Sequence, residues 1–146
     1  MKLRGKTIQR WWPTTQGLDL VQGSVEEVAH AVLAEVTRFI GRESLSASWQ
    51  SFRSLDEALN TAVEFTNVPT HFLVLPTLSN WSVLWNNSFL CNGYDSLCHC
   101  LTSNHSLRTV HWSAHDDWTT SQSGAQFIHR FPLEADMQVR SVQVAQ

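Results

Sequence analysis

The stretch that decides the fold runs from Arg108 to Phe131 and reads RTVHWSAHDDWTTSQSGAQFIHRF. Apolar and polar residues alternate over 108–113 and again over 125–131, which is the period of a strand with one covered face. Residues 115–124 between them are almost all polar and end in a glycine, so they predict a connecting loop. No helical pattern separates the two strands, and this argues against a parallel βαβ arrangement.

Further strands and a short helix are predicted around this stretch. Residues 70–75 (THFLVL) form an apolar run between two prolines, typical of a buried strand. Residues 81–86 alternate and carry Trp81 and Trp85 on one face, which we expect to lie in the core, together with Trp112. A short helix is predicted over 96–103, capped by Asp95, with Leu97 and Leu101 facing inward. Residues 139–144 are predicted to close the sheet.

Two longer helices are predicted near the start of the chain. The first spans 25–40, because Ser24 and Glu27 form a capping box and Gly41 suits the residue after the helix. The second spans 55–65 behind a similar box at Ser54 and Glu57. The expected inward residues are Val25, Val28, Val32, Leu33, Val36 and Phe39 in the first helix, and Leu55, Leu59, Ala62 and Val63 in the second.

The order of these elements predicts one α+β domain over residues 1–146. Its sheet is largely antiparallel and is packed by two N-terminal helices and one short inserted helix. Segments 7–12 and 47–52 stay ambiguous and could form edge strands.

The composition excludes several functional classes. The formal charge is −3 and no cluster of Lys or Arg occurs, which argues against a nucleic-acid binder. The N-terminus lacks the apolar region of a secretory signal, and no apolar run reaches the ~18 residues of a membrane helix. Three cysteines within ten residues do not suggest a disulfide framework. We therefore expect a cytoplasmic protein with reduced thiols that binds no membrane.

His111 and His115 are four positions apart and are followed by Asp116 and Asp117, all residue types that ligate divalent metals. That spacing brings two imidazoles together on a helix, but the pattern around His111 is that of a strand. We therefore favour an exposed histidine at a strand end beside a polar turn, and predict no metal or other cofactor.

The cysteines allow two other interpretations. Zinc sites use Cys pairs two to four residues apart, whereas Cys98-His99-Cys100 has a gap of one and no second pair. Cys91 or Cys98 could instead act as a nucleophile near Asp95, where a helix N-terminus favours thiolate, with a His as base. We favour buried, reduced cysteines that pack as small apolar residues.

Trp118 stands in the polar loop beside Asp117, with no apolar pattern around it. An accessible indole next to carboxylates is typical of an interface hot spot, although this Trp could also fold back over the sheet. Asp116 and Asp117 would then steer the encounter with a cationic partner. Alanine substitutions at 116, 117 and 118 should weaken partner binding without unfolding the domain. The predicted partner-binding residues are His111, His115, Asp116, Asp117, Trp118 and His129.

Between His71 and Arg130 the chain combines a strand with Trp81-Ser82-Val83-Leu84, a turn at Gly93-Tyr94-Asp95, a helix ending at Leu101-Thr102, a further strand, the polar loop and Gly124-Ala125. This layout resembles small bacterial immunity proteins of toxin–immunity pairs. The resemblance covers about half the chain and concerns order and composition rather than a diagnostic motif. It implies a compact, cytosolic, non-catalytic protein that covers a toxin's active site, and it assigns no functional residue.

The sequence therefore favours a non-catalytic binder of a cognate toxin or another protein. Two alternatives stay open. One is a small hydrolase or transferase that uses His and Asp, with or without a metal. The other is an oligomeric accessory protein, such as a homodimer that uses a Trp-rich interface.

Overall fold

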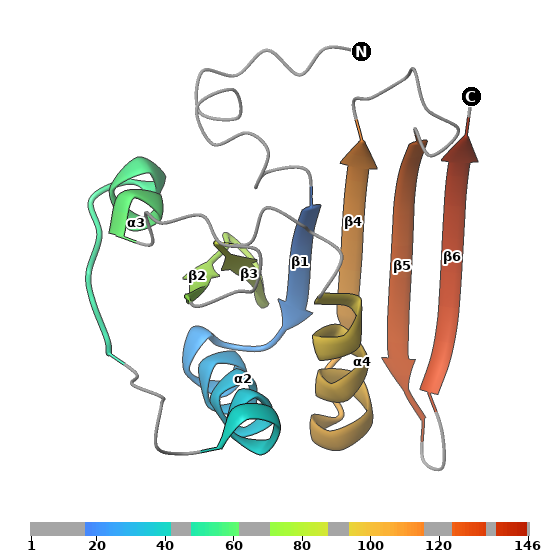
Figure 1. Ribbon diagram of the computed structural model, residues 1–146, viewed down its shortest axis with the longest axis horizontal. Coiled ribbons are helices and arrows are strands. Elements are labelled where there is room, and N and C mark those ends of the chain that lie inside the picture. The colour runs from blue at the N-terminus through green and yellow to red at the C-terminus, as the bar shows by residue number, and fades with distance from the viewer. Residues whose placement is uncertain are drawn as a thin grey trace.

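The computed structural model describes residues 17–41, 48–61, 71–87, 94–115, 124–133 and 137–145. Within these ranges the fold is α+β, with three helices and a six-stranded antiparallel sheet, which confirms the predicted class. The strand order is β2-β3-β1-β4-β5-β6 (Figure 1). The strands are β1 (Gly17–Gln22), β2 (Phe72–Pro76), β3 (Trp81–Asn86), β4 (Thr109–His115), β5 (Gly124–Pro132) and β6 (Met137–Ala145); the helices are α2 (Val25–Ile40), α3 (Leu55–Thr61) and α4 (Tyr94–His105).

Strand β1 is the element that the sequence did not predict, and it lies inside the sheet. It pairs with β3 on one side and with β4 on the other. Its Asp19 sits opposite Leu84 and His111 and is almost fully buried. An aspartate is disfavoured within strands, so its presence concealed this strand in the sequence.

The sheet has two chemically different faces. One face, called here the helix face, is covered by α2 and α4, which lie side by side across it (Figure 1). Its core joins apolar residues of both helices to the sheet: Val21, Val28, Ala31, Val32, Leu84, Leu97, Leu101 and Leu107. The opposite face, called the open face, is covered at one end by α3, where Leu59 packs with Trp85, Leu73 and Val83.

Helix α2 begins as predicted. The backbone N–H of Glu27 donates to Ser24 Oγ at 3.2 Å, and Gly41 follows the helix with a φ of 81°. Phe39, predicted to face inward, is 62% exposed. That prediction was wrong because the apolar contacts of α2 end near Val36.

Helix α3 also starts at its predicted cap, where the Glu57 N–H donates to Ser54 Oγ. Ala58 and Leu59 are buried, but Leu55 is exposed, contrary to the predicted stripe. Ala62 and Val63 lie outside the described residues. Residues 48–52 form no strand, and segment 7–12 is not among the described residues.

Buried polar contacts tie α2 to α4. Glu35 of α2 accepts hydrogen bonds from Asn104 and His105 of α4 and pairs with Arg38 of its own helix. Burial by itself raises the pKa of Glu35, but these hydrogen bonds outweigh it and hold the pKa below its usual range. None of the helices in the described part of the chain is long and apolar enough to cross a membrane.

Candidate functional site

The two described histidines of the predicted partner surface lie on opposite faces of the sheet. His111 pairs across β4 and β5 with Ile128, whereas His129 pairs with Val110. Adjacent residues of a strand point to opposite sides, so these two registers place one imidazole on each face. The structure therefore does not bring His111 and His129 together in one surface.

The other four residues of the predicted surface, His115, Asp116, Asp117 and Trp118, lie at the end of β4 and in the loop that follows it. His115 is the last residue of β4, and nothing is described of its side chain. Asp116, Asp117 and Trp118 lie outside the described residues, so the hypothesis for their loop stays a prediction.

His111 belongs to a polar cluster on the helix face, called here the buried polar cluster. Its buried members are Asp19, His111, Cys98 and Arg130, and the half-exposed Asp95 lies at its rim. Nδ1 of His111 donates to Oδ1 of Asp19 at 2.6 Å. His111 lies in the middle of β4 and is only 5% exposed, so it is not the exposed histidine that was expected. His115 takes the strand end, and the expectation for it stays a prediction. Arg130 pairs through Nη2 with Asp95 in the first turn of α4.

The buried polar cluster brings together a Cys, a His and an Asp. These are the residue types of enzymes in which a thiolate is the nucleophile, a His is the base and an Asp orients the His. Burial raises the pKa of Cys98 well above its usual range, and the nearby Asp19 carboxylate raises it further. The thiol therefore stays protonated, which is the opposite of what a nucleophile needs. Its full burial confirms the favoured prediction that Cys98 packs as a core residue.

Arg130 gives this cluster an unusual feature. The side chain is 4% exposed, and its Nε and Nη1 groups are buried without a hydrogen-bond partner. Such groups lose their hydration without replacement, so they weaken the cluster energetically. Among the described residues no group of three or more His, Cys, Asp or Glu side chains is placed to hold a metal ion.

A second cluster lies on the open face, formed by Trp81, Arg108, His129, Phe131 and Arg140; we call it the aromatic–cation cluster. The rings of His129 and Phe131 stack with centroids 3.7 Å apart. The guanidinium of Arg108 lies 4.6 Å from the Phe131 centroid, and that of Arg140 lies 5.5 Å from it. Two cations therefore share one aromatic ring, and the ring quadrupole favours each of these two contacts.

Trp81 reaches this cluster from the other half of the sheet. Its ring centroid lies 6.3 Å from that of His129, although strands β1 and β4 separate β3 from β5. Strands are roughly 4.8 Å apart, so the indole must extend across the open face to make this contact. The cluster therefore spans most of the sheet width.

The cations of the cluster change the chemistry of His129. Burial lowers the pKa of His129, and the positive charges of Arg108 and Arg140 lower it further. The imidazole is therefore neutral at neutral pH. Its Nε2 is buried without a hydrogen-bond partner.

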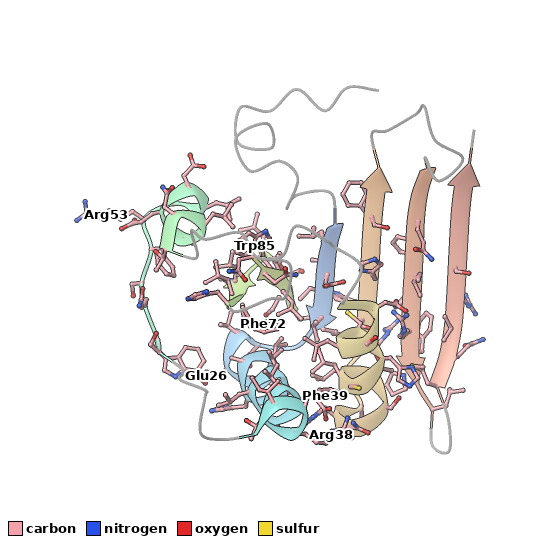
Figure 2. The ribbon with its side chains drawn as sticks, in the orientation of Figure 1. Glu26, Arg38, Phe39, Arg53, Phe72 and Trp85 are labelled. Atoms are coloured by element: carbon pink, nitrogen blue, oxygen red, sulfur yellow. The ribbon has the colours of Figure 1, made fainter. Side chains whose placement is uncertain are left out.

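Beside this cluster the open face carries exposed apolar side chains. Phe127 of β5 lies directly opposite Val142 of β6, and they are 41% and 61% exposed. The described helices that contact β4 and β5 do so on the other side of the sheet (Figure 2). This part of the open face is therefore uncovered by the helices that the structure describes.

The sequence analysis did not predict most of the aromatic–cation cluster, although the alternation in β5 indicated part of it. The alternation over 125–131 places Phe127, His129 and Phe131 on one face. Only His129 was selected from it. Arg108, Arg140 and Trp81 could not be added, because their meeting at Phe131 and His129 depends on the strand order.

Comparison of the chain with protein-family models, with curated proteins and with solved structures gives no match.

Proposed function

We propose that this protein binds another protein without catalysing a reaction, and that the partner is a toxin whose active site it covers. The observation that supports the proposal is the uncovered part of the open face, where Phe127 and Val142 lie exposed next to the aromatic–cation cluster. Aromatic residues and arginine are the side chains most enriched at binding hot spots.

The charges of this surface indicate what the partner presents. Among the described residues neither Arg108 nor Arg140 pairs with a carboxylate, and Nε of Arg108 is buried without a partner. An acidic group of the partner would satisfy these cations. Covering Phe127 and Val142 at the same time would remove about 25 cal/mol of unfavourable hydration free energy per Å² of apolar area.

Growth rescue tests the proposal. The reading frame next to the gene is expressed in a host cell with and without this protein. We expect a toxic product whose toxicity disappears on co-expression, together with a one-to-one complex in light scattering. The double variant Phe127→Ala/Arg108→Gln should lose rescue while keeping its circular dichroism spectrum. A toxin that remains fully active beside the folded wild-type protein would refute the proposal.

A hydrolase or transferase is the second candidate, favoured by the buried His111–Asp19 pair, since catalytic histidines are often oriented by a carboxylate. The two functions differ in stoichiometry. A binder neutralises the toxin only up to one equivalent, whereas an enzyme acts below one equivalent. Titration of toxin activity with purified protein therefore separates them.

A further inference from the structure

The two edges of the sheet differ in their capacity to pair with another strand. The β2 edge is short and ends in Pro76, which has no N–H to donate. Short strands and prolines are the usual means by which proteins block an edge. The β6 edge spans Met137–Ala145 and contains no Pro and no Lys. It is therefore the edge that stays competent to pair.

The β6 edge is also accessible from both faces of the sheet. Each residue from Gln138 to Val142 is exposed. Val139 is opposite Arg130 and so lies on the helix face, where it is 49% exposed. Val142 lies on the open face. A strand added here would bury apolar area on both sides as well as pairing its backbone.

The charge of the edge selects among possible occupants. Arg140 is the one charged residue of β6, and the strand has no acidic residue. Pairing with the β6 of a second copy offers Arg140 no carboxylate, and a register centred on Arg140 would place two arginines opposite each other. Like charges on adjacent strands are destabilising, whereas an acidic strand would be attracted.

We propose that β6 receives an extended segment of the partner protein as an added strand. This segment places an acidic residue beside Arg140 and an apolar residue, two positions away, beside Val142. The spacing follows because side chains two positions apart lie on the same face of a strand. Backbone hydrogen bonds supply affinity in this mode, and alternate side chains supply specificity. The inference rests on the proposed function, since it assumes that the partner is a protein.

A synthetic peptide tests the strand addition directly. The probe is a fluorescein-labelled peptide of about seven residues. Glu and Val take turns at every second position, so that they share one face of the strand, and Thr fills the positions between them. Fluorescence anisotropy should show saturable binding, and amide hydrogen exchange should slow within β6. A peptide methylated on alternate backbone nitrogens should not bind, because it lacks the N–H groups of one edge. Equal binding of the methylated peptide would overturn the proposal.

Variants of this protein test the charge and the location. Arg140→Glu should weaken binding of the Glu peptide by about tenfold and strengthen binding of a matched Lys peptide. Val142→Lys should abolish binding by blocking the edge. Leu78→Lys is the matched control, because Leu78 is fully exposed in the turn between β2 and β3. Equal weakening by Leu78→Lys would contradict the location.

Two outcomes keep the two proposals apart, and two more test the choice of occupant. Toxin binding that survives in Val142→Lys would refute strand addition and leave the proposed function intact. Absence of toxin binding by the wild type would refute the proposed function, while the peptide measurement still reports on the edge. Concentration-dependent dimerisation that Val142→Lys abolishes, or displacement of the peptide by a single-stranded oligonucleotide, would overturn the choice of an acidic protein segment.

Discussion

His111 and Asp19 form a buried pair in which Nδ1 of the imidazole lies 2.6 Å from Oδ1 of the carboxylate, although 92 positions separate them along the chain. The bond joins the two central strands β1 and β4. Both side chains are almost entirely withdrawn from solvent. Each group therefore depends on the other to satisfy its polar atoms.

Removing one member of this pair should destabilise the fold. Asp19→Ala leaves His111 buried without its acceptor, so we expect the free energy of unfolding to fall by about 3 kcal/mol. Urea denaturation followed by circular dichroism measures this change. The double variant Asp19→Leu/His111→Leu should recover much of the loss, because it buries no unpaired group. Purely additive losses in the double variant would show that the two residues are not coupled.

The Glu35 network should add an acid-sensitive term to stability. Its pKa is lowered in the folded state, so the unfolded state binds more protons as pH falls. The stabilisation is complete above the unfolded pKa of about 4.3 and is lost as pH falls through the lower folded pKa. Glu35→Gln should lower the free energy of unfolding by about 2 kcal/mol at pH 7 and flatten its slope below pH ~4.5.

Glu26→Gln is the matched control, since Glu26 is an exposed residue in the first turn of the same helix. Only a small loss is expected there, of about 0.5 kcal/mol from the helix dipole. Equal losses in the two variants would mean that Glu35 is not a specific link between α2 and α4.

His129 should titrate below the usual histidine range. Its folded pKa is lowered, so the unfolded state takes up protons first, and stability should decline as pH falls from about 6.5 toward the folded pKa. Arg140→Gln should raise the pKa of His129 in an NMR titration, because it removes one of two nearby positive charges. Arg140→Lys keeps the charge and should leave the pKa low. If the pKa of His129 were the same in Arg140→Gln as in the wild type, this electrostatic coupling would be excluded.

Cys98 should be the slower of the two described cysteines to react with iodoacetamide. It is fully buried and its pKa is raised, whereas Cys100 is partly accessible. Peptide mapping by mass spectrometry should find Cys100 alkylated first, with Cys98 modified only after unfolding. Asp19→Asn removes a negative charge near the thiol and should speed the reaction of Cys98. Rapid alkylation of Cys98 in the native protein would reopen the nucleophile interpretation.

The sequence predicted the elements whose signals are local. The start of α2 at Ser24 and the start of α3 at Ser54 depend on hydrogen bonds between residues three apart, so the capping pattern was sufficient. Strand β1 could not be found in this way. Asp19 is acceptable within a strand only because His111 meets it from β4, and that contact exists only after the sheet has formed.

The candidate surface was predictable only in part, for the same reason. Alternation assigned the side chains of β5 to faces, but it did not say which face the helices cover. Arg130 and His129 are neighbours in sequence, yet one pairs with Asp95 under α4 and the other stacks on Phe131. Covering helices and strand order are tertiary properties, so one strand's pattern does not contain them.

The position of β1 also has a consequence for biosynthesis. Of the six described strands it leaves the ribosome first, yet its two neighbours β3 and β4 are translated much later. Until β4 has emerged, β1 can pair only with β3, and Asp19 lacks the imidazole of His111 that later meets its carboxylate. Closing the centre of the sheet therefore waits for translation of β4, with the slow kinetics that non-local pairing imposes.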